Sequence, residues 1–293
     1  MDGSKFVNPA DSIVLRFEDV SLHFGDTAAL DHVSFEIHAG QTCVVYGAAG
    51  SGKTMLLKVA VGLLRHDSGR VFLFGQDITN LKERELYDIR SRVGILFQEG
   101  GLFDSLTIAD NVAYPLVNHR AFSQAAASSN GGEFAGASRS VETRVAEALR
   151  FVELEGTLEK VPSELSGGMR RRVGIARATV TKPALLLYDS PTAGLDPITA
   201  HTIIALIIKE RDLRNAATIM VTHRYQDGQL MANFRYNPNN GEIEAAKRDG
   251  GVGRVNTRFL VMKDGRLVFE GTEAELQATQ DPYVRKFLRP GGA

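Results

Sequence analysis

One stretch near the start of the chain constrains its fold more than any other. Residues 47–54 read GAAGSGKT, and this glycine loop follows an apolar run, residues 42–46, with the length of a buried strand. A uniformly apolar segment, residues 55–64, comes after the loop and fits a helix that packs against a sheet. The order strand, loop, helix predicts an α/β chain with the glycine loop at one edge of its sheet.

The composition of the glycine loop predicts a phosphate-binding site. Glycines let backbone N–H groups converge, and the helix that begins there adds partial positive charge, so amides hold the phosphate oxygens. We expect Lys53 to reach the terminal phosphates and the Thr54 hydroxyl to ligate Mg²⁺. An ordinary glycine-rich turn is the alternative, which the flanking strand and helix disfavour. The expected nucleotide-binding positions are Gly47, Ala48, Ala49, Gly50, Ser51, Gly52, Lys53 and Thr54.

Composition and charge limit the other functions open to the chain. Its 293 residues are 43% hydrophobic and 24% charged, which is typical of a soluble domain with a sizeable core. The formal net charge of −1 gives no electrostatic reason to expect a nucleic-acid partner. The single cysteine, Cys43, excludes an intrachain disulfide and lies in the predicted buried strand. Since no apolar run approaches about 18 residues, we expect any membrane role to come through a partner protein.

Three further apolar runs end in polar side chains, Gln98, Asp189 and His223. If these runs are parallel strands, their ends meet at the edge of the sheet where the glycine loop lies. A carboxylate at the end of a buried strand beside a phosphate loop is typical of a Mg²⁺ ligand. We therefore expect the three side chains to share one site. The other histidines show no spacing of metal ligands, so we expect no separate metal site.

A second candidate anion-binding element is the Ser-Gly-Gly loop, Ser166, Gly167 and Gly168, which opens an Arg-rich helix over residues 170–179. The arginines could form a nucleic-acid patch, but the neutral chain favours a solvated or acid-paired helix face. Phe24 stands before a turn ahead of the glycine loop. It either stacks on an adenine ring or packs in the core, and the sequence leaves both open.

Composition shifts divide the chain. Residues 123–138 are rich in Ala, Ser and Gly and predict a flexible surface insertion between helical segments at 106–117 and 140–152. Residues 233–257 are rich in Asn and Gly and predict an extended loop or an irregular hairpin. A short tail, residues 276–293, ends the chain.

Over residues 13–275 the chain resembles the ATP-binding cassette (ABC) ATPases, because their motifs occur in order: GAAGSGKT, Gln98, LSGGM, LLLYDS, AGLDP and His223. The resemblance implies an α/β fold with a RecA-like P-loop NTPase core, an antiparallel β subdomain and a helical subdomain. That helical subdomain, about residues 99–175, carries the ABC signature. A head-to-tail homodimer is also implied, with each ATP between the glycine loop of one subunit and the Ser-Gly-Gly loop of the other.

The resemblance further implies a role for each motif. Catalysis is expected from Gln98, Asp189, Ser190 and His223. The remaining implied roles are adenine stacking for Phe24, phosphate binding for Lys53, metal binding for Thr54, Gln98 and Asp189, γ-phosphate contact for His223, and a place at the dimer seam for Asp196.

Shorter strings resemble the ATPase of the Mla-type intermembrane phospholipid transporters: GILFQ, GLFDSLT, the Met of LSGGM, DPIT and the tail string DPYVRKFL. This narrower resemblance implies a membrane permease partner and an MCE-domain lipid-binding partner. It also implies glycerophospholipid as cargo and a peripheral position on the cytoplasmic face of the plasma (inner) membrane.

The sequence departs from the family at Ser190, where the family has the glutamate that activates the attacking water. A serine hydroxyl cannot take a proton as a carboxylate does, and that general-base contribution is worth ~10²–10⁴-fold. We expect retained ATP binding and dimerisation with slow hydrolysis, in which His223 orients the water. Two functions follow, the motor subunit of a lipid transporter or an ATP-gated clamp with little turnover. A DNA-repair or translation ABC protein would need coiled-coil insertions or tandem cassettes, and the sequence has neither.

Overall fold

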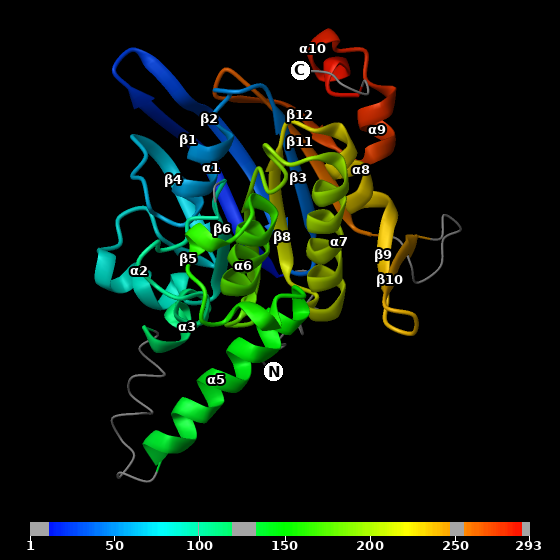
Figure 1. Cartoon of the computed structure of the whole chain (residues 1–293). Helices are drawn as coiled ribbons and strands as arrows, with labels where there is room; N and C mark the ends of the chain where they lie inside the picture. Colours follow the sequence, from blue (N-terminus) through cyan, green and yellow to red (C-terminus); the bar gives the residue numbers. More distant parts are fainter. Residues whose placement is uncertain (1–11, 99, 119–132, 247–254, 289–293) are drawn as a thin grey trace, which may run out of the picture.

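The computed structural model describes residues 12–98, 100–118, 133–246 and 255–288. Its central layer is a six-stranded sheet in the order β12–β11–β3–β8–β7–β6, shown in Figure 1. β11, β3, β8, β7 and β6 run parallel, and β12 runs antiparallel to β11 at one edge. The strands are β3 (Thr42–Gly47), β6 (Val93–Leu96), β7 (Leu185–Asp189), β8 (Ala217–Thr222), β11 (Thr257–Lys263) and β12 (Arg266–Gly271).

A second, antiparallel sheet covers one side of the central one. Its order is β2–β1–β4–β5, and its core includes Phe17 stacked on Phe35 with ring centroids 4.8 Å apart. Its strands are β1 (Ile13–Phe24), β2 (Thr27–His38), β4 (Ser68–Leu73) and β5 (Gln76–Asp77).

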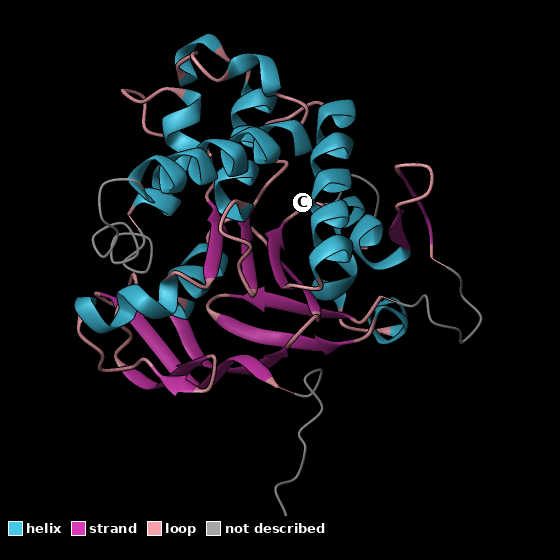
Figure 2. Cartoon of the chain, turned by 90° about the horizontal axis from the view of Figure 1, so that it is seen from below, coloured by secondary structure: helices cyan, strands magenta, loops and turns pink. Residues whose placement is uncertain are grey.

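Most helices gather on the other side of the strands, as Figure 2 shows. The helices are α1 (Lys53–Ala60), α2 (Glu83–Arg90), α3 (Ile108–Val117), α5 (Glu133–Phe151), α6 (Gly167–Thr179), α7 (Pro197–Arg214), α8 (Tyr225–Asn233), α9 (Glu273–Ala278) and α10 (Pro282–Lys286), with 3-10 turns η2 (Glu155–Thr157) and η3 (Pro162–Glu164).

Strand β3 lies between two hydrophobic cores because successive strand residues point to opposite faces. Val44 and Tyr46 belong to the core on the side of the helices α3, α5, α6 and α7. Cys43 and Val45 belong to the core beneath the antiparallel sheet and α1. Every residue of β3 is buried, which explains its unbroken apolar sequence and confirms the prediction that the Cys43 thiol is buried.

Two predicted segments differ in the structure. α5 begins at Glu133, so residues 133–138 of the predicted flexible insertion are helical and extend the helix predicted from residue 140. Alanine favours helix, and this Ala-containing segment extends the amphipathic helix that follows it. Residues 123–132 of that insertion lie outside the described ranges. Of residues 233–257, predicted as an extended loop or an irregular hairpin, part forms a hairpin without register shifts, β9 (Phe234–Asn237) paired with β10 (Glu242–Ala245). Residues 247–254 lie outside the described ranges.

Candidate functional site

The glycine loop joins β3 to α1 and requires glycine at two positions because other atoms approach too closely. A Cβ on Gly47 would lie 2.3 Å from the Ser51 hydroxyl oxygen and 2.7 Å from the Met262 carbonyl oxygen. Gly52 caps α1 with a φ of 101°, and a Cβ there would lie 2.3 Å from the Ala29 carbonyl oxygen. Glycine is therefore required at both positions, because any side chain there would clash with neighbouring protein atoms.

Lys53 is the first residue of α1, and its side chain turns back over the glycine loop. Its Nζ donates hydrogen bonds to the carbonyl oxygens of Gly47 and Ala48, both at 2.7 Å, and to the Ser51 hydroxyl at 3.3 Å. Partial burial lowers the pKa of Lys53 to about 8, and the charge of Asp189 opposes this shift. The ammonium is thus held by neutral carbonyls at the glycine loop, where the sequence predicts the phosphates of a nucleotide.

The strand order brings the predicted strand-end residues to one edge of the sheet. Gln98 follows β6, Asp189 ends β7 and His223 follows β8, and β8 pairs with β3, which leads into the glycine loop. Gln98 and His223 are exposed, whereas Asp189 is only 3% exposed. This shared edge is the placement expected from parallel strands.

Ser190 is held in an unusual backbone conformation directly after Asp189. Its φ is +47°, in the left-handed region that non-glycine residues rarely adopt. Its N–H donates to the Val221 carbonyl at 2.9 Å, and its hydroxyl donates to Asp189 Oδ1 at 3.2 Å. The hydroxyl is therefore a hydrogen-bond donor to the buried carboxylate. Backbone conformations of this kind concentrate at functional sites.

The sequence reading missed a buried carboxylate, Asp227 on α8, beside this edge. Asp227 is 2% exposed and accepts hydrogen bonds from the hydroxyls of Thr192, at 2.5 Å, and Thr222, at 2.9 Å. Arg224 lies 3.7 Å away, and burial raises the pKa of Asp227. These bonds tie the segment after Ser190 to the strand end that carries His223. An acidic residue in a helix gives no local sequence signal of such a contact.

The Ser-Gly-Gly loop packs against the start of α7. Ser166 caps α6 by accepting from the Met169 N–H at 3.2 Å, and Ser166 and Gly167 are exposed. A Cβ on Gly168 would lie 2.5 Å from Thr199 Cγ2, so the close packing requires glycine. Asp196 caps α7 and accepts from the N–H groups of Thr199 and Ile198, each at 3.0 Å. Hydrogen bonding from the Thr199 side chain, followed by these N–H groups, lowers the pKa of Asp196.

The arginines of α6 match the predicted solvated or acid-paired face only in part: Arg172 lies 3.9 Å from the Glu153 carboxylate, whereas Arg171 and Arg177 turn to backbone carbonyls. Arg171 is buried and donates to the carbonyls of Phe97, at 3.3 Å, and Ala193, at 3.2 Å. Arg177 donates to the carbonyls of Gly101, at 2.7 Å, and Gly100, at 3.0 Å. A guanidinium offers five donors, which satisfy loop carbonyls that no strand or helix uses. α6 is thereby connected to the chain on either side of Gln98 and to the loop after Ser190.

Phe24 lies at the end of β1, and its side chain is 54% exposed. Because the side chain is exposed, Phe24 does not pack in the core, which was one of its two predicted roles. Its ring is available to stack on a planar ligand.

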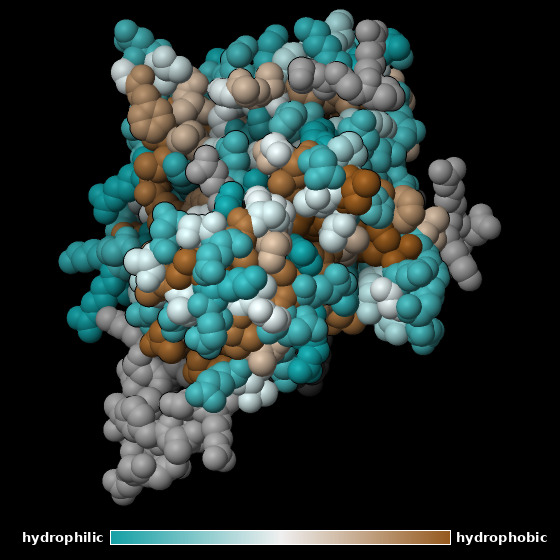
Figure 3. All heavy atoms as spheres, viewed as in Figure 1, coloured by the Kyte–Doolittle hydropathy of each residue, from teal (hydrophilic) through white to brown (hydrophobic). Residues whose placement is uncertain are grey.

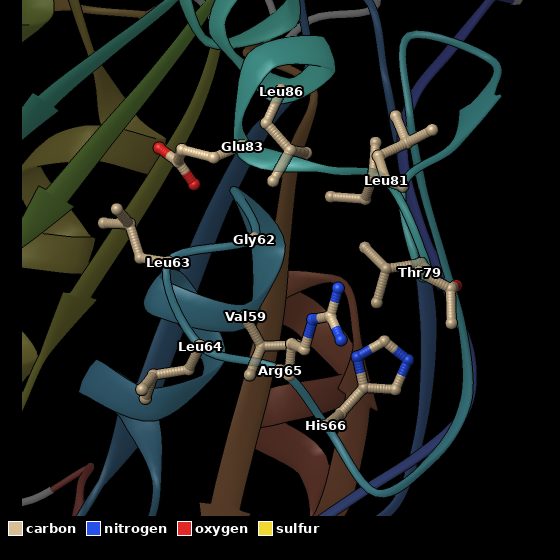
Figure 4. A pocket seen from close by; sticks show the side chains of 12 residues that line it. Val59, Gly62, Leu63, Leu64, Arg65, His66, Thr79, Leu81, Glu83 and Leu86 are labelled. Atoms are coloured by element: carbon tan, nitrogen blue, oxygen red, sulfur yellow. The ribbon is translucent and has the colours of Figure 1, made fainter.

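A separate pocket lies at the opposite end of α1 from the glycine loop. It has a volume of about 270 Å³, and Leu63, Leu64, Leu81 and Leu86 line it together with Arg65, His66 and Glu83 (Figure 4). Among the described residues, no three His, Cys, Asp or Glu side chains gather as metal ligands would, and no helix has the length and hydropathy needed to cross a membrane.

The residues at the sheet edge fit a nucleoside triphosphate with Mg²⁺. The Lys53 ammonium and the N-terminus of α1 place positive charge at the glycine loop, which suits a phosphate. The Thr54 hydroxyl and the Asp189 carboxylate are hard oxygen donors of the kind that Mg²⁺ prefers.

Comparison of the sequence with known families shows to which family this chain belongs. A family model described as ABC transporter matches residues 30–193, more than half of the chain. The chain belongs to the ABC transporter family. This ABC protein is an ATPase whose hydrolysis is coupled to transport, and the predicted α/β fold class is confirmed.

Two relatives and one solved structure are similar to this ABC protein. It is 30% identical over 276 residues to the intermembrane phospholipid transport system ATP-binding protein MlaF of Haemophilus influenzae, which covers 94% of this chain and 90% of the relative. It is 32% identical over 276 residues to the probable ribonucleotide transport ATP-binding protein mkl of Mycobacterium leprae, covering 94% and 69%. The solved structure is a dimeric post-hydrolysis state of the ATP-binding cassette MJ0796 bound to ADP and Pi. Its TM-score is 0.69, with 26% identity over 88% of this chain and 98% of that one.

Proposed function

We propose that this ABC ATPase is the ATP-hydrolysing subunit of a complex that moves phospholipid between membranes. The observation that carries the proposal is the similarity to MlaF, a phospholipid transport protein by name, over 94% of this chain. The strings GLFDSLT and DPYVRKFL, which resemble the Mla-type ATPases, add to it. The similarity to mkl makes ribonucleotide the competing cargo.

The site residues divide the work of ATP hydrolysis. The amides of the glycine loop and Lys53 hold the phosphates, and Phe24 stacks on adenine. Thr54, Asp189 and Gln98 would hold Mg²⁺, which neutralises phosphate charge when bound. His223 contacts the γ-phosphate and orients the attacking water. Because a serine hydroxyl is too weak a base to take a proton from water, catalysis depends on positioning and charge.

A head-to-tail homodimer would complete the site. Ser166, Gly167 and Phe24 are exposed in one chain, and Ile198, two residues after Asp196, is 81% exposed. An apolar side chain beside a polar helix cap is suited to an interface that forms around ATP. The solved structure similar to this chain is described as dimeric, which supports a dimer here.

The helical side of the molecule offers a surface for a membrane permease. Phe103 and Tyr114 are both exposed, their ring centroids lie 4.6 Å apart, and Val117 is exposed one turn further along α3. Figure 3 shows other hydrophobic residues scattered among polar ones on the face it draws. We assign this aromatic pair to a permease at the cytoplasmic face of the inner membrane, with an MCE-domain protein as the lipid-binding partner beyond it.

Purification of the tagged chain from detergent-solubilised membranes tests this proposal. The expected result is a complex with an integral membrane protein. After reconstitution into phosphatidylethanolamine and phosphatidylglycerol vesicles, it should move fluorescent phosphatidylethanolamine only with ATP. Lys53→Ala is the control that should abolish this movement. Purification without a membrane protein, or ATP-driven movement of ribonucleotide but not of lipid, would overturn the proposal.

The ATP-gated clamp is the second candidate, because Ser190 stands where the family has its catalytic glutamate. In that function ATP closes the dimer and turnover is minor. It predicts nucleotide-dependent dimerisation of the wild-type chain with turnover close to that of the Lys53→Ala variant, both alone and in the membrane complex.

A further inference from the structure

The C-terminal helix α10 reaches the glycine loop through one side chain. The Tyr283 hydroxyl accepts a hydrogen bond from the Ala48 N–H at 3.3 Å and donates one to the Met262 carbonyl at 3.0 Å. Met262 pairs with Gly47 at the end of the β3–β11 ladder. The hydroxyl thus links β11, through Met262, to Ala48, the first residue after β3.

The peptide unit between Gly47 and Ala48 is held from both sides. Tyr283 holds its N–H, and Lys53 Nζ donates to its carbonyl oxygen, Gly47 O, at 2.7 Å. Because the peptide group is planar, fixing the direction of the N–H also fixes the direction of the carbonyl. Tyr283 therefore orients an acceptor on which the Lys53 ammonium rests.

An aromatic stack anchors α10 without using this hydroxyl. Phe287 is buried, lies nearly parallel to Tyr46 with ring centroids 6.3 Å apart, and contacts Tyr283 edge-on at 5.3 Å. Tyr46, the residue before the glycine loop, also stacks on Phe259 at 5.9 Å. Figure 1 shows α10 following α9 at the end of the sheet near β11 and β12.

A cap and a cation complete the anchor. Asp281 caps α10 by accepting from the N–H groups of Tyr283, at 2.7 Å, and Val284, at 3.0 Å. Lys263 Nζ lies 5.3 Å from the centre of the Tyr283 ring. Removing the hydroxyl would leave ring stacking, cap and cation contact in place.

We infer that Tyr283 is a positioning residue for ATP and that α10 is a working part of the nucleotide site. The family model ends at residue 193, so this contribution comes from outside the matched segment. Through the Gly47–Ala48 peptide, Tyr283 sets the loop geometry that Lys53 needs to meet phosphate. The inference rests on ATP binding by the ABC family and is independent of the cargo.

The test is the affinity of the full-length Tyr283→Phe variant for a fluorescent ATP analogue, with KM and kcat for ATP measured alongside. One hydrogen bond in the loop corresponds to roughly 3- to 10-fold in binding. We expect Kd and KM to rise by about that factor while kcat changes less than twofold. Tyr236→Phe, on the distant β9–β10 hairpin, is the matched control and should leave both values unchanged.

Amide hydrogen exchange separates positioning from a general loss of structure. In Tyr283→Phe we expect faster exchange in residues 47–53 and unchanged exchange in β8, with an unchanged melting temperature. Phe287→Leu, which loosens the anchor but keeps the hydroxyl, should weaken ATP binding in the same direction. Unchanged ATP affinity in Tyr283→Phe overturns the inference. Weaker binding accompanied by faster exchange throughout the sheet also overturns it, because that result describes a structural role. Neither result bears on phospholipid as the cargo.

Discussion

The Ser190 hydroxyl donates a hydrogen bond to the buried Asp189 carboxylate across 3.2 Å. This relationship places a donor where the family has a proton-accepting glutamate, so the water that attacks ATP lacks a carboxylate base. We expect ATP binding not to depend on that base, since the phosphate contacts are assigned to the glycine loop and Lys53 in the proposed function. Binding and hydrolysis can therefore be changed separately in this protein.

Ser190→Glu is expected to raise the steady-state rate of ATP hydrolysis by about 10²-fold or more, since it adds a general base beside Asp189. The affinity for ATP should stay within about twofold. Hydrolysis by the purified chain is measured by phosphate release, with Lys53→Ala as the background. A variant no faster than wild type would show that the missing carboxylate does not limit turnover.

The affinity for ATP should fall as pH rises above the pKa of Lys53. Burial has lowered that pKa to about 8, so the ammonium is fully charged only below it. Bound phosphate raises the pKa again, and binding therefore takes up a proton between the two values. Titration calorimetry with ATP in buffers from about pH 7 to about pH 9.5 checks this linkage. A Lys53→Arg variant, which stays charged, should show a flatter profile; equal slopes would contradict the prediction.

Gly52→Ala should destroy ATP binding and lower the melting temperature. The new Cβ would lie 2.3 Å from the Ala29 carbonyl oxygen, at a φ of 101°. Gly75→Ala is a matched control, because Gly75 has a φ of 81° but nothing within 4 Å of the added Cβ. The control carries backbone strain of about 1 kcal/mol without the clash and should still bind ATP. If Gly52→Ala bound ATP as well as Gly75→Ala does, the close approach would not explain the glycine at position 52.

Asp227→Ala should destabilise the fold by about 2–4 kcal/mol in urea unfolding, because the Thr192 and Thr222 hydroxyls lose their buried acceptor. Asp227→Asn keeps an acceptor and should cost much less. Burial raises the pKa of Asp227, so the ionised form costs stability. The stability of Asp227→Asn relative to wild type should therefore increase as pH rises through that pKa. An equal loss of unfolding free energy in both variants would show that the hydrogen bonds are not the cause.

Ile198→Ser should weaken ATP-induced dimerisation by about 10-fold, since it removes a large exposed apolar side chain from the proposed interface. Sedimentation of the wild-type chain and of Ile198→Ser with a slowly hydrolysed ATP analogue measures the effect. Leu213→Ser is the control, because Leu213 is also exposed but lies at the other end of α7. Dimers of equal strength in the two variants would argue against the head-to-tail arrangement.

Local patterns predicted the elements that position the site. Buried strands read as unbroken apolar runs, and the glycine loop needs its residues for reasons internal to the loop. The rule that parallel strands end at one edge predicts that Gln98, Asp189 and His223 lie together. The start of α5 was mispredicted because an Ala-containing segment fits both a loop and a helix.

The sequence by itself determined the strand–loop–helix unit, the α/β class and the order of the catalytic motifs, since each depends on residues close together in the chain. Tertiary structure alone decided that Arg171 turns inward, that Asp227 joins two threonines and that Tyr283 holds Ala48 from 235 residues away. These contacts satisfy buried donors and acceptors left over when loops pack. Which groups are left over depends on how the whole chain folds, and no local pattern records it.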